Sequence, residues 1–179
     1  MSYITDNLLK KVISENEPFL TEYEFQFALA MAIKEENPDL KVKIEQKVYC
    51  DDEDKENCRC DIVAYKDNEE VLLAELKYVV TLGAQSDKTS MGARMSFVSD
   101  VKRLYDLEKF PNAEKYCIFI TNKKAVYDNK VKGNNYFNDN YANIELWTPV
   151  SFKESVNDVH YLIVNAKEKG KDIPNEYKY

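Results

Sequence analysis

Two charged residues lie inside one of the most apolar segments of the chain. Residues 71–80 are almost continuously apolar and predict a buried strand, yet they include Glu75 and Lys77. Residues two apart in a strand point to the same face of a sheet, so these two charges share one side. Ionised groups in such a strand are costly unless they are paired or bind a metal ion. This segment therefore constrains both the fold and the site.

A carboxylate also interrupts the strand that we expect just before this one. Residues 60–65 predict a strand that contains Asp61, and a turn at 66–70 joins it to the segment 71–80. Asp61 and Glu75 can therefore be neighbours across a hairpin. Two adjacent carboxylates repel each other unless a cation lies between them, and Mg²⁺ or Mn²⁺ suits such oxygen ligands. Lys77 would lie beside the ion, where it could orient a water or stabilise charge on a phosphate.

The remaining segments indicate an α/β fold. We expect helices at 5–15, from Thr21 to Asn37, at 95–109 and near 154–168, and strands at 42–49, 60–65, 71–80, 116–121 and 144–147. The second of these helices is apolar nearly all round, which predicts a buried helix. We expect loops at 81–92 and 128–143. Together these elements predict a central mixed sheet of four to five strands flanked by helices, in one domain spanning 1–179.

The motif and its context resemble the PD-(D/E)xK nuclease superfamily, which has the restriction-endonuclease-like fold. The likeness rests on Asp61 and on Glu75-Leu76-Lys77 in the following strand. It covers about residues 20–122, which would form the core, and leaves 123–179 as a C-terminal extension. The resemblance implies a Mg²⁺-dependent endonuclease in which Asp61, Glu75 and the Leu76 backbone carbonyl bind the metal and Lys77 positions the attacking water. Cys60 stands where many members have a proline.

The resemblance also implies a metal-site carboxylate on the first core helix, where two candidates occur. Glu24 lies three residues after Thr21 and fits a capping box, which is a structural role. Glu22 lies four residues before Gln26, on the helical phase that faces the core. We therefore prefer Glu22 and keep Glu24 as the second choice. Glu45 is a third candidate, but its strand alternates with lysines, which predicts an outward charge.

The net charge of −7 argues at first against a nucleic-acid partner. Residues 86–132 nevertheless hold 10 Lys and Arg against 6 Asp and Glu, so one surface could be basic. Candidate nucleic-acid contacts are Gln26, Lys88, Arg94, Lys102 and Arg103. Arg103 could instead pair with Asp100 one helical turn earlier. DNA is the expected partner, in restriction, phage defence or repair, and RNA is the alternative; a homodimer is a candidate assembly.

Other features exclude several classes of protein. Cys58 and Cys60 are too closely spaced for a typical zinc pair, so we expect free thiols in a reducing cytoplasm, with Cys60 and Cys117 buried in strands. A single histidine, His160, argues against a catalytic triad. No apolar run is long enough to span a membrane, and the first residues lack the build of a secretory signal, so the chain is expected in the cytoplasm.

Two other interpretations of the charged residues stay open. The chain could be a non-catalytic module of the same fold that binds nucleic acid or a protein. It could also be an unrelated, metal-free α/β protein in which Asp61, Glu75 and Lys77 form a buried ion network.

Overall fold

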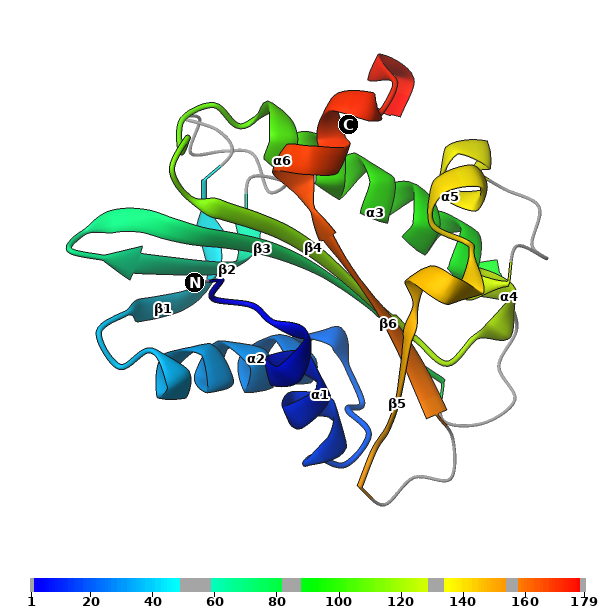
Figure 1. The fold of residues 1–179 in the computed structure, drawn as a ribbon, viewed down its shortest axis with the longest axis horizontal. Coiled ribbons are helices and arrows are strands. Elements are labelled where there is room, and N and C mark those ends of the chain that lie inside the picture. Colours follow the sequence, from blue (N-terminus) through cyan, green and yellow to red (C-terminus); the bar gives the residue numbers. More distant parts are fainter. Residues whose placement is uncertain (1, 49–58, 82–87, 129–133, 154–157, 178–179) are drawn as a thin grey trace.

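A six-stranded mixed sheet forms the centre of the protein (Figure 1). The computed structural model describes residues 2–48, 59–81, 88–128, 134–153 and 158–177. Across the sheet the strand order is β1-β2-β3-β4-β6-β5; β3 and β4 are parallel and the other neighbours are antiparallel. The strands are β1 Lys41–Lys47, β2 Arg59–Lys66, β3 Glu69–Val79, β4 Glu114–Thr121, β5 Thr148–Ser151 and β6 Asp158–Asn165. The expected α/β class and mixed sheet are confirmed, with one strand more than predicted.

Helices cover both faces of this sheet. Figure 1 shows α1 (Asp6–Ser14) and α2 (Glu22–Glu36) on one side and α3 (Lys88–Asp106) on the other. The short helices are α4 Lys124–Tyr127, α5 Asn135–Asn140, η2 Ile144–Leu146, α6 Ala166–Lys169, η3 Gly170–Asp172 and η4 Asn175–Tyr177. The period-two alternation of the strands produces two cores. Ile62 and Leu76 pack with α1 and α2, whereas Val63 and Leu73 pack with α3.

A tight turn joins the two strands that carry the motif. Asp67 and Asn68 both have left-handed backbones, with φ of 53° and 70°. This pair is typical of a two-residue type I′ hairpin, and Asn and Asp tolerate such angles better than other non-glycine residues. The predicted hairpin is therefore present, and its register pairs Ile62 with Ala74.

The C-terminal third differs most from the sequence-based prediction. The helix expected near 154–168 is wrong, because β6 occupies Asp158–Asn165 and α6 follows it. Val159, Tyr161, Ile163 and Val164 are β-branched or aromatic, which favours a strand on a half-buried surface. The strand expected at 144–147 is replaced by η2, with β5 directly after it. The expected loop at 128–143 contains α5.

Two helices also begin or face differently from the prediction. α3 begins at Lys88 and not at 95, so the expected loop 81–92 is partly helical; residues 82–87 lie outside the described residues. α2 is not buried all round, because Tyr23, Phe27 and Met31 are exposed. The sequence could not show this, since every side of α2 carries apolar residues and the side that packs depends on its neighbours.

Two of the four cysteines lie in strands that the structure describes. Cys60 and Cys117 are free and buried in β2 and β4, as expected, whereas Cys50 and Cys58 lie outside the described residues. Among the helices that the structure describes, none is both long enough and apolar enough to cross a bilayer.

Candidate functional site

The strands β2 and β3 separate at the motif. Their ladder pairs Ile62 with Ala74, while β3 continues beside β4 as far as the pair Val79–Thr121. Past Ala74, two backbone N–H groups of β3 bond to carboxylates. Asp61 Oδ2 accepts from Leu76 N at 2.6 Å, and Glu22 Oε2 accepts from Tyr78 N at 2.6 Å. The two acids thus take the place of a neighbouring strand at this point of the sheet.

The Leu76 carbonyl, which the resemblance implies as a metal ligand, also lies where β2 and β3 separate. In a strand, the N–H and C=O of one residue point to the same edge. Since Leu76 N donates to Asp61, the Leu76 carbonyl faces the same edge of β3 as that carboxylate. The strand geometry therefore orients this carbonyl toward the side of β3 on which Asp61 lies.

Gln26 of α2 holds the backbone next to this point. Its Nε2 donates to the Asp61 carbonyl at 2.5 Å and to Glu45 Oε1 at 3.1 Å, and only 3% of the residue is exposed. Glu45 has a left-handed backbone with φ of 53°, which is uncommon outside glycine. The prediction that Glu45 points outward is wrong, because its carboxylate bonds to this buried amide.

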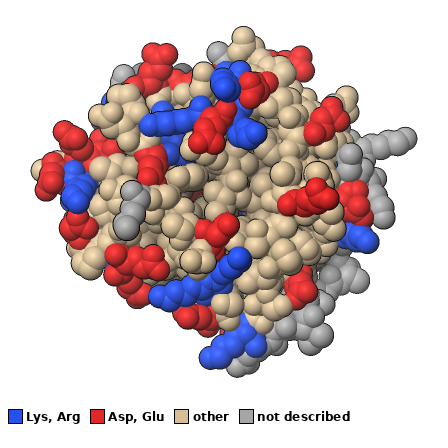
Figure 2. Space-filling view, in the orientation of Figure 1, with Lys and Arg blue, Asp and Glu red and all other residues tan. Residues whose placement is uncertain are grey.

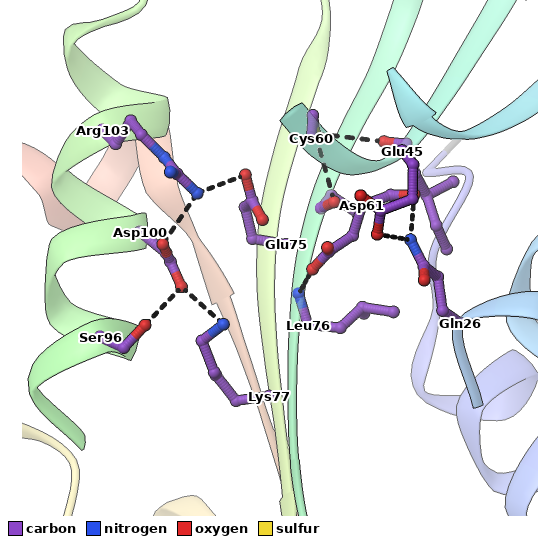
Figure 3. A network of polar contacts seen from close by, with 12 residues as sticks. Gln26, Glu45, Cys60, Asp61, Glu75, Leu76, Lys77, Ser96, Asp100 and Arg103 are labelled. Atoms are coloured by element: carbon purple, nitrogen blue, oxygen red, sulfur yellow. Dashed lines mark hydrogen bonds and ion pairs between the residues drawn. The ribbon is translucent and has the colours of Figure 1, made fainter. Parts of the chain in front are cut away.

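On the other side of β3, charged side chains form ion pairs with α3 (Figure 3). Arg103 Nη2 lies 2.8 Å from Glu75 Oε1 and 2.9 Å from Asp100 Oδ1, and Lys77 Nζ lies 3.2 Å from Asp100 Oδ2. The predicted pair of Asp100 with Arg103 is confirmed. The contact between Asp100 and Lys77 was not predicted, although Asp100 lies on the buried phase of α3, between Phe97 and Leu104.

Burial changes the protonation of several groups. Desolvation raises the pKa of Asp61 above its usual 3.8, against the opposing effects of the Leu76 N–H, Lys77 and a hydrogen bond with Glu75. Desolvation likewise raises the pKa of Glu22. Burial alone would lower the pKa of Lys77, but Asp100 and the nearby carboxylates outweigh it and raise that pKa. Lys77 is therefore protonated at neutral pH.

The carboxylates at the motif are the groups that could hold a metal ion. Glu75 influences the pKa of Asp61 through a side-chain hydrogen bond, which two carboxyl groups can form only when one of them is protonated. If both are ionised, they repel each other unless a cation lies between them. Within the described part of the chain, no group of three or more His, Cys, Asp or Glu side chains is arranged to hold a metal. A carboxylate pair nonetheless matches the one or two carboxylates with which Mg²⁺ is often bound, the remaining ligands being waters and phosphates.

The charges around the pair do not balance. Four carboxylates, from Glu22, Asp61, Glu75 and Asp100, interact with the two cations Lys77 and Arg103. Full ionisation leaves two excess negative charges among these six residues. A divalent cation would compensate both of them, whereas without one the buried site favours protonated carboxyl groups.

The first-helix candidates occupy different places. Glu22 interacts with the charges of Lys77 and Asp61. Glu24 lies at the start of α2, where its N–H donates to Thr21 Oγ1 at 3.1 Å and its Oε2 accepts from Leu20 N at 2.6 Å. The bond from Glu24 N to Thr21 is the N-cap bond that the sequence predicts, but the Glu24 carboxylate bonds to Leu20 N–H, one residue before the N-cap whose N–H it would accept in a capping box. Helical phase was sufficient to separate the two acids.

Most of the side chains proposed to contact nucleic acid have internal partners. Arg94 is fully buried and donates to the Ala125 and Val126 carbonyls and to Asn138. Lys102 is buried and pairs with Asp106 at 3.0 Å. Gln26 and Arg103 bond within the network described above, and the side chain of Lys88 lies outside the description. Figure 2 shows acidic and basic side chains interspersed on one face, with no continuous field of either sign there.

A comparison of the chain with protein families, curated proteins and solved structures found no match. The geometry and charge of the site are therefore the features that indicate a function.

Proposed function

We propose that the chain is a metal-dependent nuclease with a restriction-endonuclease-like core, and that it hydrolyses phosphodiester bonds of DNA. The observation that carries this proposal is the hydrogen bond from Leu76 N to the Asp61 carboxylate where β2 and β3 separate, because Leu76 lies between Glu75 and Lys77 on β3. This combination offers metal-binding oxygens and a fixed cation at one point of the sheet.

Each residue has a role that its contacts support. Asp61, Glu75 and the Leu76 carbonyl would hold the ion, and Glu22 would do so directly or through water. Bound Mg²⁺ or Mn²⁺ would supply a Lewis acid for the phosphate and lower the pKa of a water. Gln26 holds the Asp61 backbone, so it positions that carboxylate.

Lys77 acts as a cation in this proposal and not as a general base. Its raised pKa keeps the ammonium charged at neutral pH, so it has no free lone pair to accept a proton. The ammonium can donate a hydrogen bond to the attacking water or to a phosphate oxygen. Asp100, 3.2 Å away, restrains its position.

The direct test is cleavage of plasmid DNA, linear duplex, single-stranded DNA and RNA, each with Mg²⁺, Mn²⁺ or a chelator. We expect metal-dependent nicking or cleavage of DNA, and a loss of about 10³-fold or more in Asp61→Asn and Glu75→Gln, because each removes a ligand charge. Both amides keep an oxygen that can accept the original hydrogen bonds.

Two exposed acids near the motif provide matched controls. Asp67→Asn lies in the hairpin turn and suits its left-handed backbone, and Glu69→Gln lies at the start of β3. Both should cleave like the wild type. Equal activity in Asp61→Asn and the wild type would refute the proposed mechanism, and cleavage of RNA alone would correct the substrate.

A non-catalytic module of the same fold is the second candidate. The observation in its favour is that Lys77, Arg103, Asp100 and Glu75 already pair with one another. Calorimetric titration with Mn²⁺ distinguishes the two candidates. A metal-dependent nuclease should give binding heat that is lost in Asp61→Asn, whereas a non-catalytic module without a metal site should give none.

A further inference from the structure

One face of α2 exposes a row of large apolar side chains. Leu20, Tyr23, Phe27 and Met31 are 74%, 57%, 54% and 46% exposed. Tyr23, Phe27 and Met31 are four residues apart, so they lie on one side of the helix, away from the core residues Phe25, Leu29 and Ile33, and Leu20 precedes the helix at its N-terminal end. Isolated exposed apolar residues are ordinary, but a contiguous row of four is typical of an interaction surface.

Two hollows adjoin this row, one at each end. The first, about 580 Å³, lies beside the N-terminal half of α2 and is lined by Phe19, Leu20 and Tyr23 among others. The second, about 630 Å³, lies between the C-terminal half and β1 and is lined by Met31, Leu40 and Ile44 among others. Phe27 lines both hollows, so it marks the centre of the surface.

The two hollows carry opposite charges. The charged residues that line the N-terminal hollow are Glu17 and Glu24. The C-terminal hollow is lined by Lys34, Lys41, Lys43 and Asp39, and Asp39 pairs with Lys66 at 2.6 Å. The surface is thus acidic at one end, apolar in the middle and basic at the other end.

We propose that this face of α2 is a twofold interface between two copies of the chain. A twofold axis near Phe27 would lay the two α2 helices antiparallel and place the acidic end of each copy opposite the basic end of the other. A symmetric interface requires a patch that is complementary to itself, and this arrangement of charges meets that requirement. The inference does not depend on the proposed nuclease activity.

The same surface disfavours other arrangements. β1 is an edge strand, but an antiparallel pairing of two β1 strands in one continuous sheet would bring Lys41, Lys43 and Lys47 of one copy close to the lysines of the other. Nucleic acid would meet an apolar row and an acidic end. Contact between helices buries the row and avoids both conflicts.

Sedimentation velocity of the full chain over a range of concentrations tests the proposal. We expect a species of twice 20.9 kDa that dissociates on dilution. Phe27→Glu, at a half-exposed position, should fold normally and weaken association by about tenfold or more, since central apolar side chains dominate such interfaces. Leu146→Glu is a matched control at another exposed apolar site, on η2, and should leave association unchanged.

A charge exchange tests the antiparallel arrangement and does not depend on the Phe27 variant. Glu17→Lys or Lys41→Glu alone should weaken the dimer, and the two changes together in one chain should restore it. Restoration supports a twofold axis near Phe27. The inference is overturned by a wild type that stays monomeric at every concentration, by a dimer that Phe27→Glu leaves intact, or by failure of the double variant to recover.

Discussion

The charged side chains on the two sides of β3 have different kinds of partner. Toward α3, Glu75, Lys77, Asp100 and Arg103 form ion pairs between 2.8 and 3.2 Å. Toward α2, Asp61 and Glu22 bond to backbone N–H groups, and desolvation raises both of their pKa values. Paired buried charges hold a structure in place, whereas buried carboxylates with raised pKa values are typical of sites that take up a proton or a cation. The charges toward α3 are thus compensated by ion pairs and those toward α2 by backbone N–H groups, and under the proposed function Glu75 would join Asp61 and Glu22 in holding the ion.

Breaking the α3 side should have the largest effect. Arg103→Met leaves Glu75 and Asp100 without their shared cation, so we expect a loss of about 3–5 kcal/mol in the free energy of unfolding. Urea denaturation measures this loss. Lys124→Met, which removes a more exposed pair with Asp128 at 3.7 Å, is the control and should cost under about 0.5 kcal/mol. Equal losses in the two variants would contradict the supporting role.

A metal ion bound at the proposed site should raise the free energy of unfolding. Mn²⁺ or Mg²⁺ at about 100 times its Kd should stabilise the wild type by about 2.7 kcal/mol, since the ion binds the folded state. Thermal unfolding with and without a chelator measures the shift in Tm. The shift should be lost in Asp61→Asn and kept in Asp67→Asn. A shift that persists in Asp61→Asn would place the ion elsewhere.

Without metal, Asp61→Asn should stabilise the protein at neutral pH. The raised pKa means that the folded state holds this proton more tightly than the unfolded chain, so stability falls as the pH rises above 3.8 through the raised pKa. The variant lacks this titration, and its advantage should grow with pH by about 1.4 kcal/mol for each unit of raised pKa. Denaturation between acid and neutral pH, in chelator, tests the sign. A wild type that gains on the variant as the pH rises would contradict it.

We expect the smallest effect on the free energy of unfolding from Ser96, at the edge of the ion pairs between β3 and α3. Ser96 Oγ lies 3.5 Å from Asp100 Oδ2, at the limit of a hydrogen bond, while Arg103 and Lys77 lie closer. Ser96→Ala should therefore change the free energy of unfolding by under about 0.5 kcal/mol. A larger loss in denaturation experiments would mean that Ser96 helps to hold Asp100.

Local patterns predicted much of the fold and the candidate site. The alternation and the turn at 66–70 were sufficient to predict the hairpin of β2 and β3, because a hairpin pairs residues that are close in the chain, and its register ends at Ile62 and Ala74, next to Asp61 and Glu75. Helical phase separated Glu22 from Glu24. β6 was predicted as a helix although its β-branched residues favoured a strand, because an apolar run by itself does not distinguish the two.

The sequence by itself determined where the unusual charges lie and which of them share a hairpin or a helical turn, since those relations depend on spacing alone. Only the tertiary structure decided which partners they meet. Asp100 reaches Lys77 because α3 packs on β3, and Glu45 turns toward Gln26 through a left-handed backbone. The exposed row of α2 was decided in the same way, because burial depends on neighbours that are distant in the chain.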